Sequence, residues 1–336
     1  MENEIRWGIV GAGRIARKFA LGLAHTKDAR LVAVASRTKE SADQFAGEFA
    51  DPFGEITRHV GVAALASDDS VDVVYIATPH PMHKDATLQC LNSGKAVLCE
   101  KPFAMNVTEA TEMIKCARAN RVFLMEAVWS HFFPAMAKVR EIIASGAIGD
   151  VRLLQSSFCY ATDWDPAGRL LSPALGGGAL LDVGIYNVAL AQMVFQKPPT
   201  QIDSTVHLGE TGVDEQSSVT LGYDGGAMAV LTSSIRTSTR HDAAIYGTHG
   251  SIVIPHMFWQ PEKIVLTIGL AHEQGHEQEL HYPKTGNGYN YEAEEVGDCL
   301  RKGALESPIM PLDTTLAHLQ IMDSIRKQWG LVYPME

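Results

Sequence analysis

Short apolar runs alternate with amphipathic stretches through the first 126 residues of the chain. Strand-like apolar runs cover residues 5–10, 31–35, 71–76, 96–99 and 122–125. The clearest predicted helix covers residues 107–119, where apolar side chains recur at spacings of three and four. Asn106 and Glu109 form the pattern of a capping box at its start. This alternation predicts a parallel sheet covered by helices.

The pattern changes after residue 126. One helix is predicted over residues 133–145, and strands over 151–158, 202–208, 243–246, 251–254 and 264–268. The alternating segments 219–223 and 229–235 flank Asp224-Gly225-Gly226, which predicts an antiparallel hairpin. Two closing helices are predicted over 291–302 and 313–328. The sequence therefore predicts an α/β domain over residues 1–126 and an α+β domain over residues 127–336.

Composition narrows the class of protein. A chain of 336 residues exceeds the size at which one hydrophobic core usually keeps growing, so two domains are expected. The net charge of −11 provides no basic surface for nucleic acid. No run approaches the roughly 20 apolar residues of a membrane span, and the amino end lacks a secretory pattern. We expect a soluble, cytoplasmic protein that binds neither nucleic acid nor membrane.

Two residue types bear on metal and disulfide chemistry. The five cysteines are an odd number without close pairing, which argues against a disulfide framework. The thirteen histidines include no His-Glu-x-x-His or facial carboxylate grouping, so no metal site is predicted.

The first strand leads into the string Gly11-Ala12-Gly13-Arg14-Ile15-Ala16, which opens a helix. Gly11 would form the tight turn and Gly13 would let the backbone approach a pyrophosphate at the helix start. An ordinary strand-to-helix turn can share this pattern, but the surrounding strand and helix favour a dinucleotide-binding Rossmann domain. Gly11, Gly13, Arg14 and Ile15 are the predicted residues of this turn.

The end of the second strand indicates which dinucleotide is bound. A carboxylate there usually accepts hydrogen bonds from the adenosine ribose, whereas this chain has Ser36-Arg37. A guanidinium and a hydroxyl suit a 2′-phosphate, so NADP is favoured over NAD. Alternatively, Arg37 is an exposed loop-tip residue and Glu40 reaches the ribose.

Several separated strings resemble the glucose-fructose oxidoreductase and inositol dehydrogenase (Gfo/Idh/MocA) family, in its dihydrodiol and D-xylose dehydrogenase branch. They span essentially the whole chain. They are Arg6-Trp7-Gly8-Ile9-Val10, His80-Pro81-Met82-His83-Lys84, Ala96 through Pro102, Phe123 through Trp129, Gly176 through Tyr186, and Glu210-Thr211-Gly212-Val213-Asp214.

The resemblance implies roles for particular residues. Lys101 of Glu100-Lys101-Pro102 and Tyr186 at the end of the glycine-rich helix start would serve catalysis. Most of the wider family has His in place of Tyr186, which puts inositol-type chemistry in doubt. The resemblance also implies a second domain with a mostly antiparallel open sheet that pairs with another subunit as a homodimer. The remaining implied site residues are Thr78, Pro79, His83 and Glu100 toward the cofactor, and Trp129 and Asp182 toward the substrate.

The residues themselves are compatible with this chemistry. A nearby ammonium favours the phenolate form of a tyrosine, so Tyr186 assisted by Lys101 would exchange the alcohol proton during hydride transfer. Asp182 lies four residues before Tyr186, on the same side of a helix. Each of these residues also has an ordinary structural interpretation. Tyr186 could be a core aromatic residue and Lys101 an ordinary loop lysine. Asp182 could stabilise a helix start, and His83 could be a surface histidine.

We therefore expect an NADP-dependent oxidoreductase acting on a secondary alcohol or hemiacetal of a cyclic polyol, such as a trans-dihydrodiol or an aldopyranose like D-xylose or D-glucose. Two alternatives stay open at this point. One is a dinucleotide-binding sensor without turnover. The other is an enzyme that retains its cofactor and oxidises one sugar while reducing another.

Overall fold

The computed structural model describes residues 4–269 and 275–336. The chain divides into two compact units, which are described separately. The first comprises Met1–Phe132 and Thr285–Leu316, and the second comprises Phe133–Lys284 and Ala317–Glu336. The sequence division at residue 126 treats each domain as one continuous segment, whereas residues 285–316 belong to the first unit.

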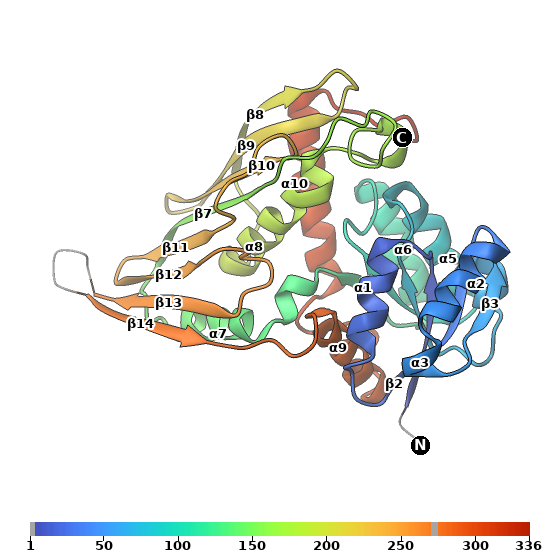
Figure 1. The fold of residues 1–336 in the computed structure, drawn as a ribbon. Coiled ribbons are helices and arrows are strands. Elements are labelled where there is room, and N and C mark those ends of the chain that lie inside the picture. The colour runs from blue at the N-terminus through green and yellow to red at the C-terminus, as the bar shows by residue number, and fades with distance from the viewer. Residues whose placement is uncertain (1–3, 270–274) are drawn as a thin grey trace. The chain divides into compact units, whose positions relative to one another are not determined.

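The first unit contains a six-stranded sheet in the order β3-β2-β1-β4-β5-β6, and all of its neighbouring strands are parallel. This is the strand order of a Rossmann domain. Strands β2 and β3 are labelled in Figure 1. The sequence predicts every strand except β3, which is short and has largely exposed side chains. The strands are β1 (Ile5–Val10), β2 (Ala29–Ser36), β3 (Thr57–Val60), β4 (Val73–Ile76), β5 (Ala96–Glu100) and β6 (Leu124–Ala127).

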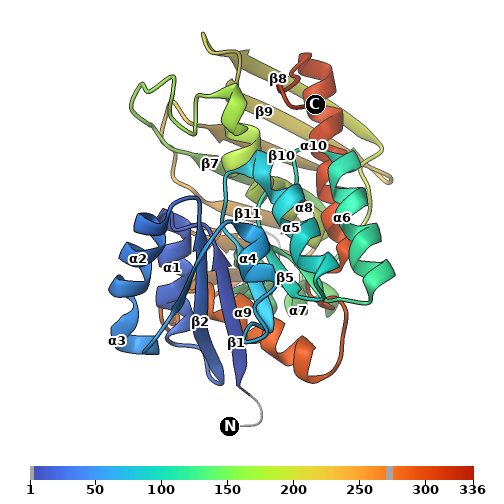
Figure 2. The ribbon, with the colours of Figure 1, turned by 90° about the vertical axis from the view of Figure 1, so that its right-hand side faces the viewer.

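Helices cover both faces of this sheet; in Figure 2, α1 and α2 lie on one side of β1 and β2, with α4 and α5 on the other. The predicted cap of α6 is confirmed, because Asn106 Oδ1 accepts a hydrogen bond from Glu109 N at 3.0 Å. The helices of the unit are α1 (Arg14–Leu23), α2 (Lys39–Glu48), α3 (Ala50–Phe53), α4 (Val62–Ala66), η1 (His80–Met82), α5 (His83–Asn92), α6 (Val107–Asn120), η2 (Trp129–Phe132) and α9 (Tyr289–Arg301).

An aromatic stack fastens α1 to the sheet. Phe19 of α1 is fully buried between Trp7 of β1 and Tyr75 of β4, with ring centroids 5.1 Å and 3.8 Å away. Burying side chains of this size contributes a few kcal/mol each, so the start of α1 is held firmly against the strand that precedes it.

The second unit is built on an eight-stranded sheet in the order β14-β13-β12-β11-β7-β10-β9-β8. Among the described strands of this sheet, only β7 and β10 pair in parallel, so the predicted mostly antiparallel sheet is confirmed. The Asp224-Gly225-Gly226 hairpin joins β9 and β10 as predicted. The strands are β7 (Val151–Cys159), β8 (Gln201–Leu208), β9 (Asp214–Tyr223), β10 (Ala227–Ser234), β11 (Ala243–Gly247), β12 (Gly250–Ile254), β13 (Lys263–Ile268) and β14 (His276–His281).

The helices of the second unit are α7 (Pro134–Ala144), η3 (Pro173–Leu175), the π-helical turn η4 (Leu180–Gly184) and α8 (Ile185–Phe195). The last helix, α10 (Leu312–Trp329), has residues 312–316 in the first unit and the rest in the second. α8 and η4 pack on β7 and β10.

One segment, Pro173–Phe195, is long and apolar enough to cross a membrane by length and composition alone. This corrects the expectation that no run approaches that length. Because 89% of its most apolar window is buried within the structure, it has the character of a core helix.

Candidate active site

The predicted cofactor residues follow four neighbouring strands of the first unit. Gly11 follows β1, Arg37 follows β2, Thr78 follows β4 by two residues and Lys101 follows β5. Because these strands are parallel, the four loops lie at the same carboxyl edge of the sheet. This edge, on either side of β1, is the place where Rossmann domains bind dinucleotides.

The glycine turn between β1 and α1 has the geometry that its sequence predicts. Gly11 has φ +105°, and a Cβ there would lie 2.7 Å from the carbonyl oxygen of Ala77. A Cβ on Gly13 would meet no atom within 4 Å. Gly13 is the N-cap of α1 without a side-chain cap, so open backbone leads to the helix start. This open helix start fits the pyrophosphate of a dinucleotide.

Other predicted cofactor residues surround this turn. Arg14, which is exposed, and Ile15, which is half-buried, open α1. Pro79 is exposed, whereas Thr78 Oγ1 is buried without a hydrogen-bond partner among the described residues. An orphaned hydroxyl beside the glycine turn is a further feature that a bound group would satisfy.

The loop after β2 has the composition noted in the sequence. Ser36 ends β2 and is half-buried, and Arg37 is exposed. The next residue, Thr38, caps α2 by accepting a hydrogen bond from Ser41 N at 3.2 Å. Arg37 therefore stands where β2 ends and before a fixed helix start.

Lys101 follows a buried carboxylate that the strands hold in place. Glu100 is 6% exposed, its Oε1 accepts a hydrogen bond from the Tyr75 hydroxyl, and its Oε2 accepts one from Lys101 N at 3.1 Å. Lys101 itself is half-buried, and its peptide bond to Pro102 is cis. The backbone of the Lys101 turn is thus tied to β4 through Glu100.

A second carboxyl, Glu292 of α9, is fully buried in the same unit, and neither of its oxygens has a hydrogen-bond partner among the described residues. Burial and then repulsion by Glu100 raise the pKa of Glu292 well above its ordinary value. Both effects favour the protonated, uncharged form of the Glu292 carboxyl. The sequence does not reveal this residue, because nothing local distinguishes Glu292 from the other acidic residues of α9.

His83 links two of the predicted loops. Its side chain is fully buried, with Nδ1 2.9 Å from the Pro102 carbonyl oxygen and Nε2 2.9 Å from the Thr78 carbonyl oxygen. Burial, as the largest cause, lowers its pKa. The surface histidine considered from sequence is therefore excluded, and the ring connects the Thr78 loop to the Lys101 turn.

Trp129, predicted to shape the substrate site, is 7% exposed in η2. Its ring stacks on Tyr289 of α9 with centroids 4.3 Å apart and planes 10° from parallel. The sequence could not supply this partner, which lies 160 positions later and returns to the first unit with α9.

In the second unit, Asp182 lies in the π-helical turn η4 and Tyr186 in the first turn of α8. Asp182 is 7% exposed and binds two side chains from the segment after β7. Its Oδ2 accepts from the Tyr160 hydroxyl at 2.6 Å, and its Oδ1 from Arg169 Nη1 at 2.8 Å. π-Helical turns occur frequently at functional sites, because they re-aim side chains within a helix.

Tyr186 is 7% exposed and packs in an aromatic cluster that the sequence analysis missed. Phe158 of β7 lies 5.4 Å from the Tyr186 ring, centroid to centroid, and stacks on Trp259 at 3.6 Å. His241, Phe258 and Tyr160 also lie around Phe158. The members of the cluster come from separate segments of the chain, so the sequence alone does not predict that they pack together.

The sites fall into two groups. All predicted cofactor residues, Lys101 and Trp129 belong to the first unit, whereas Asp182 and Tyr186 belong to the second. Each group is assembled by its own unit.

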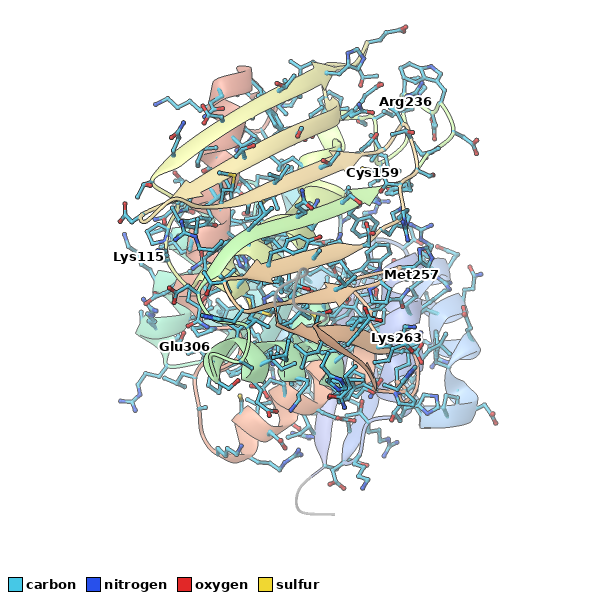
Figure 3. The ribbon with its side chains drawn as sticks, turned by 90° about the vertical axis from the view of Figure 1, so that its left-hand side faces the viewer. Lys115, Cys159, Arg236, Met257, Lys263 and Glu306 are labelled. Carbon is cyan, nitrogen blue, oxygen red and sulfur yellow. The ribbon has the colours of Figure 1, made fainter. Side chains whose placement is uncertain are left out.

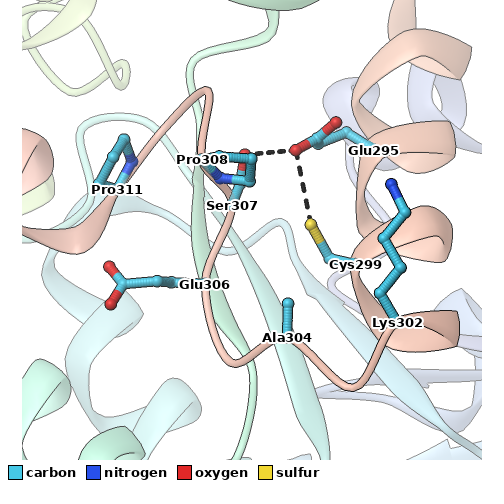
Figure 4. A pocket seen from close by; sticks show the side chains of 8 residues that line it. All are labelled: Glu295, Cys299, Lys302, Ala304, Glu306, Ser307, Pro308 and Pro311. Atoms are coloured by element: carbon cyan, nitrogen blue, oxygen red, sulfur yellow. Dashed lines mark hydrogen bonds between the residues drawn. The ribbon is translucent and has the colours of Figure 1, made fainter.

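A separate pocket of about 540 Å³ lies beside α9 in the first unit (Figure 4). Glu295 Oε1 there accepts hydrogen bonds from Ser307 Oγ at 2.5 Å and Cys299 Sγ at 3.5 Å. Burial and the neighbouring Glu295 raise the pKa of the Cys299 thiol to about 12, so it is not a thiolate nucleophile. The lining residues, Glu295, Cys299, Lys302, Ala304, Glu306, Ser307, Pro308 and Pro311, include none of the predicted site residues.

Known proteins share this sequence and fold. Residues 5–128 match the model of the oxidoreductase family with an NAD-binding Rossmann fold, and residues 136–253 match the GFO/IDH/MocA C-terminal domain. The chain is 40% identical to trans-1,2-dihydrobenzene-1,2-diol dehydrogenase of Mus musculus, over 99% of both chains. It is 37% identical to the Homo sapiens protein of that name, again over 99% of both.

Solved structures confirm the fold. The aldose-aldose oxidoreductase from Caulobacter crescentus superposes with a TM-score of 0.87 at 24% identity, covering 97% of this chain and 98% of the other. A 3-ketoreductase from Actinomadura kijaniata, solved with NADP and TDP-benzene, gives a TM-score of 0.83 at 25% identity with the same coverage. Together, the two family models and the full-length relatives confirm the resemblance noted in the sequence: this chain belongs to the Gfo/Idh/MocA family of oxidoreductases.

Proposed function

We propose that the protein is an NADP-dependent dehydrogenase that oxidises a secondary alcohol of a cyclic polyol, with trans-dihydrodiols of aromatic rings as the first substrate class to test. The observation that carries the proposal is the aromatic cluster around Phe158 in the second unit, against which the Tyr186 ring packs. A flat, apolar ring that bears two hydroxyls suits such a surface better than a fully hydroxylated sugar does. The relatives named dihydrodiol dehydrogenases support the same choice.

The chain's own residues supply acid-base catalysis. When bound, the dinucleotide accepts or returns the hydride. Tyr186 takes the alcohol proton during oxidation and returns it during carbonyl reduction, while the positive charge of Lys101 favours the phenolate form of Tyr186. Glu100 holds the backbone of the Lys101 turn, and His83 ties that turn to the Thr78 loop.

Asp182 has a structural role in addition to the substrate binding proposed for it. Because it already accepts hydrogen bonds from Tyr160 and Arg169, it orders the segment after β7 beside Tyr186. We propose that one of its oxygens also accepts a hydrogen bond from the substrate hydroxyl next to the reacting carbon. We propose that the apolar ring of Trp129 also contacts the substrate.

NADP is the proposed cofactor. Ser36 and Arg37 place a hydroxyl and a guanidinium at the end of β2, where a ribose-binding carboxylate would otherwise stand. The Actinomadura kijaniata 3-ketoreductase, solved with NADP, supports this preference.

We propose the cytoplasm as the location of the protein. The five free cysteines, four of them buried, are consistent with this location.

We also propose that the protein is a homodimer that pairs through the open face of the eight-stranded sheet (Figure 3). Leu153 is the cross-strand partner of both Met228 and Tyr246, which are 42% and 38% exposed. An apolar row on a sheet face is a feature that a partner would cover. Light scattering should give twice the chain mass of 36.5 kDa, and a monomer at all concentrations would exclude the pairing.

Absorbance at the NADPH band tests the proposed activity with panels of dihydrodiols, aldoses and dicarbonyls. Tyr186→Phe should lower kcat by a factor of about 10² to 10⁴, the usual contribution of a general acid or base, without changing NADPH affinity. Tyr223→Phe is the matched control, since that buried hydroxyl has no hydrogen-bond partner among the described residues. Equal rates for the two variants would exclude Tyr186 as the acid or base.

A further inference from the structure

A buried carboxyl lies beside the start of the helical segment that carries Asp182 and Tyr186. Asp214 opens β9, its side chain is fully buried, and its Oδ2 accepts a hydrogen bond from Leu180 N at 2.6 Å. The backbone N–H of Ala179 also faces this carboxyl. The first N–H groups of a helix have no partner within the helix, so Asp214 caps them from 34 positions away.

The glycine-rich turn before this segment is shaped around Asp214. Gly178 has φ +115°, and a Cβ there would lie only 2.2 Å from Asp214 Oδ1. The carboxyl thus fills the space that a side chain would take. The turn is held from two further sides, because the Tyr333 hydroxyl donates to the Gly177 carbonyl oxygen at 2.6 Å and Gly178 N donates to the Leu170 carbonyl oxygen at 2.9 Å.

We propose that Asp214 is a positioning residue for the dehydrogenase reaction, because its carboxylate caps and fixes the helical segment that presents Asp182 and Tyr186. This inference rests on the proposed function. Asp214 acts through the backbone of η4, which leads into α8 one residue before Tyr186.

The strength of this cap depends on the charge of Asp214. Burial raises the pKa of Asp214 to about 7, opposed by the N–H groups of Leu180 and Ala179 and by Arg326 of α10. The Tyr333 hydroxyl from the C-terminal segment is a further titratable group that faces it. Arg326 is itself paired with Asp323 and Glu336. An ionised carboxylate accepts stronger hydrogen bonds than a neutral acid, so the cap strengthens as pH rises through about 7.

The variant Asp214→Asn tests this inference, because it keeps the size and a hydrogen-bond acceptor but removes the charge. Turnover of a dihydrodiol is measured from roughly pH 5.5 to 9 in the full-length enzyme. We expect kcat at the alkaline end to fall about tenfold, as for the loss of one charge-assisted hydrogen bond, and the rise in kcat near pH 7 to disappear. NADPH affinity should stay unchanged, because the proposed cofactor residues belong to the other unit.

Asp224→Asn, in the exposed β9–β10 turn, is the matched control and should retain the parental kcat and pH profile. The melting temperature gives an independent readout, since the Asn variant should gain stability relative to the parent as pH rises through about 7. If the Asn variant does not fold, Asp214→Ser, which also provides an N-cap acceptor without charge, carries the same expectations.

The outcomes separate this inference from the proposed function. An active parent with an Asn variant of unchanged kcat and pH profile would overturn the role of Asp214 and leave the dehydrogenase intact. A fall in kcat with the pH dependence near 7 preserved would also overturn it, because that result describes structural damage. An inactive parent on the whole substrate panel would refute the proposed function itself.

Discussion

Replacing each of the two glycines of the β1–α1 turn by alanine should have a different effect. One replacement should lower stability, and the other should weaken cofactor binding. Gly11 has φ +105°, and an added Cβ would lie 2.7 Å from the Ala77 carbonyl oxygen. Backbone strain in the left-handed region costs about 1–2 kcal/mol. Crowding against a backbone atom that cannot rotate away adds about 1–3 kcal/mol. Gly11→Ala should therefore lower the free energy of unfolding of the first unit by about 2–5 kcal/mol.

Gly13→Ala should spare stability and impair cofactor binding. Gly13 has φ −84°, which alanine adopts readily, and an added Cβ would meet no atom within 4 Å. The free energy of unfolding should change by less than about 0.5 kcal/mol. The methyl group would occupy the approach to the start of α1, where loss of one hydrogen bond to a charged group costs about 1.5–3 kcal/mol. The Kd for NADPH should rise by roughly 10- to 100-fold.

Urea unfolding and NADPH fluorescence titration of the two variants and the parent measure both effects. The two variants control for each other, because each adds one methyl group to the same turn, at positions 11 and 13. A Gly13→Ala protein with parental NADPH affinity would show that the pyrophosphate does not approach this backbone. A Gly11→Ala protein as stable as the parent would refute the steric argument.

Three further predictions concern charge. Arg37→Asp should raise the KM for NADP by about 100-fold and leave the KM for NAD nearly unchanged. The reason is that the 2′-phosphate loses a charge-assisted contact and is repelled by the new carboxylate. Equal effects on both cofactors would exclude a contact between Arg37 and the 2′-phosphate. The folded-state pKa of Glu292 is raised, so the stabilising contribution of its carboxyl is complete below the ordinary value of 4.5 and is lost as pH rises. In urea unfolding, Glu292→Gln should therefore gain stability relative to the parent as pH rises above 4.5, and a constant difference would contradict this. Arg169→Met should lower kcat/KM by about tenfold while leaving the melting temperature nearly unchanged, because its ion pair with Asp182 is 37% exposed on the Arg169 side.

The sequence predicts those parts of the fold whose signals are local. The strand, glycine turn and helix at residues 5–23, the Asn106 cap and the Asp224-Gly225-Gly226 hairpin each follow from residues close together in the chain. The edge strands β3 and β14 escaped prediction, since an exposed edge needs no apolar alternation. The return of residues 285–316 to the first unit depends on packing between distant segments.

The candidate site likewise contains some residues that the sequence predicts and others that it does not. Gly11, Gly13 and Arg37 could be assigned from spacing, whereas Lys101 and Tyr186 depended on resemblance to a family. The carboxyls of Asp214 and Glu292 carry no local sign of burial, because charged residues are ordinarily exposed. Their unusual environments arise from segments that only the folded chain brings together.

We propose that Lys101 and Tyr186 act together as a single acid-base pair. A double-mutant cycle on kcat with Lys101→Met, Tyr186→Phe and the combined variant measures this directly. Residues that act as a unit are strongly non-additive, so the combined variant should be no more than a few-fold slower than the slower single variant. If the fall in kcat of the combined variant equals the product of the two single falls, Lys101 and Tyr186 act independently and the proposed pair is wrong.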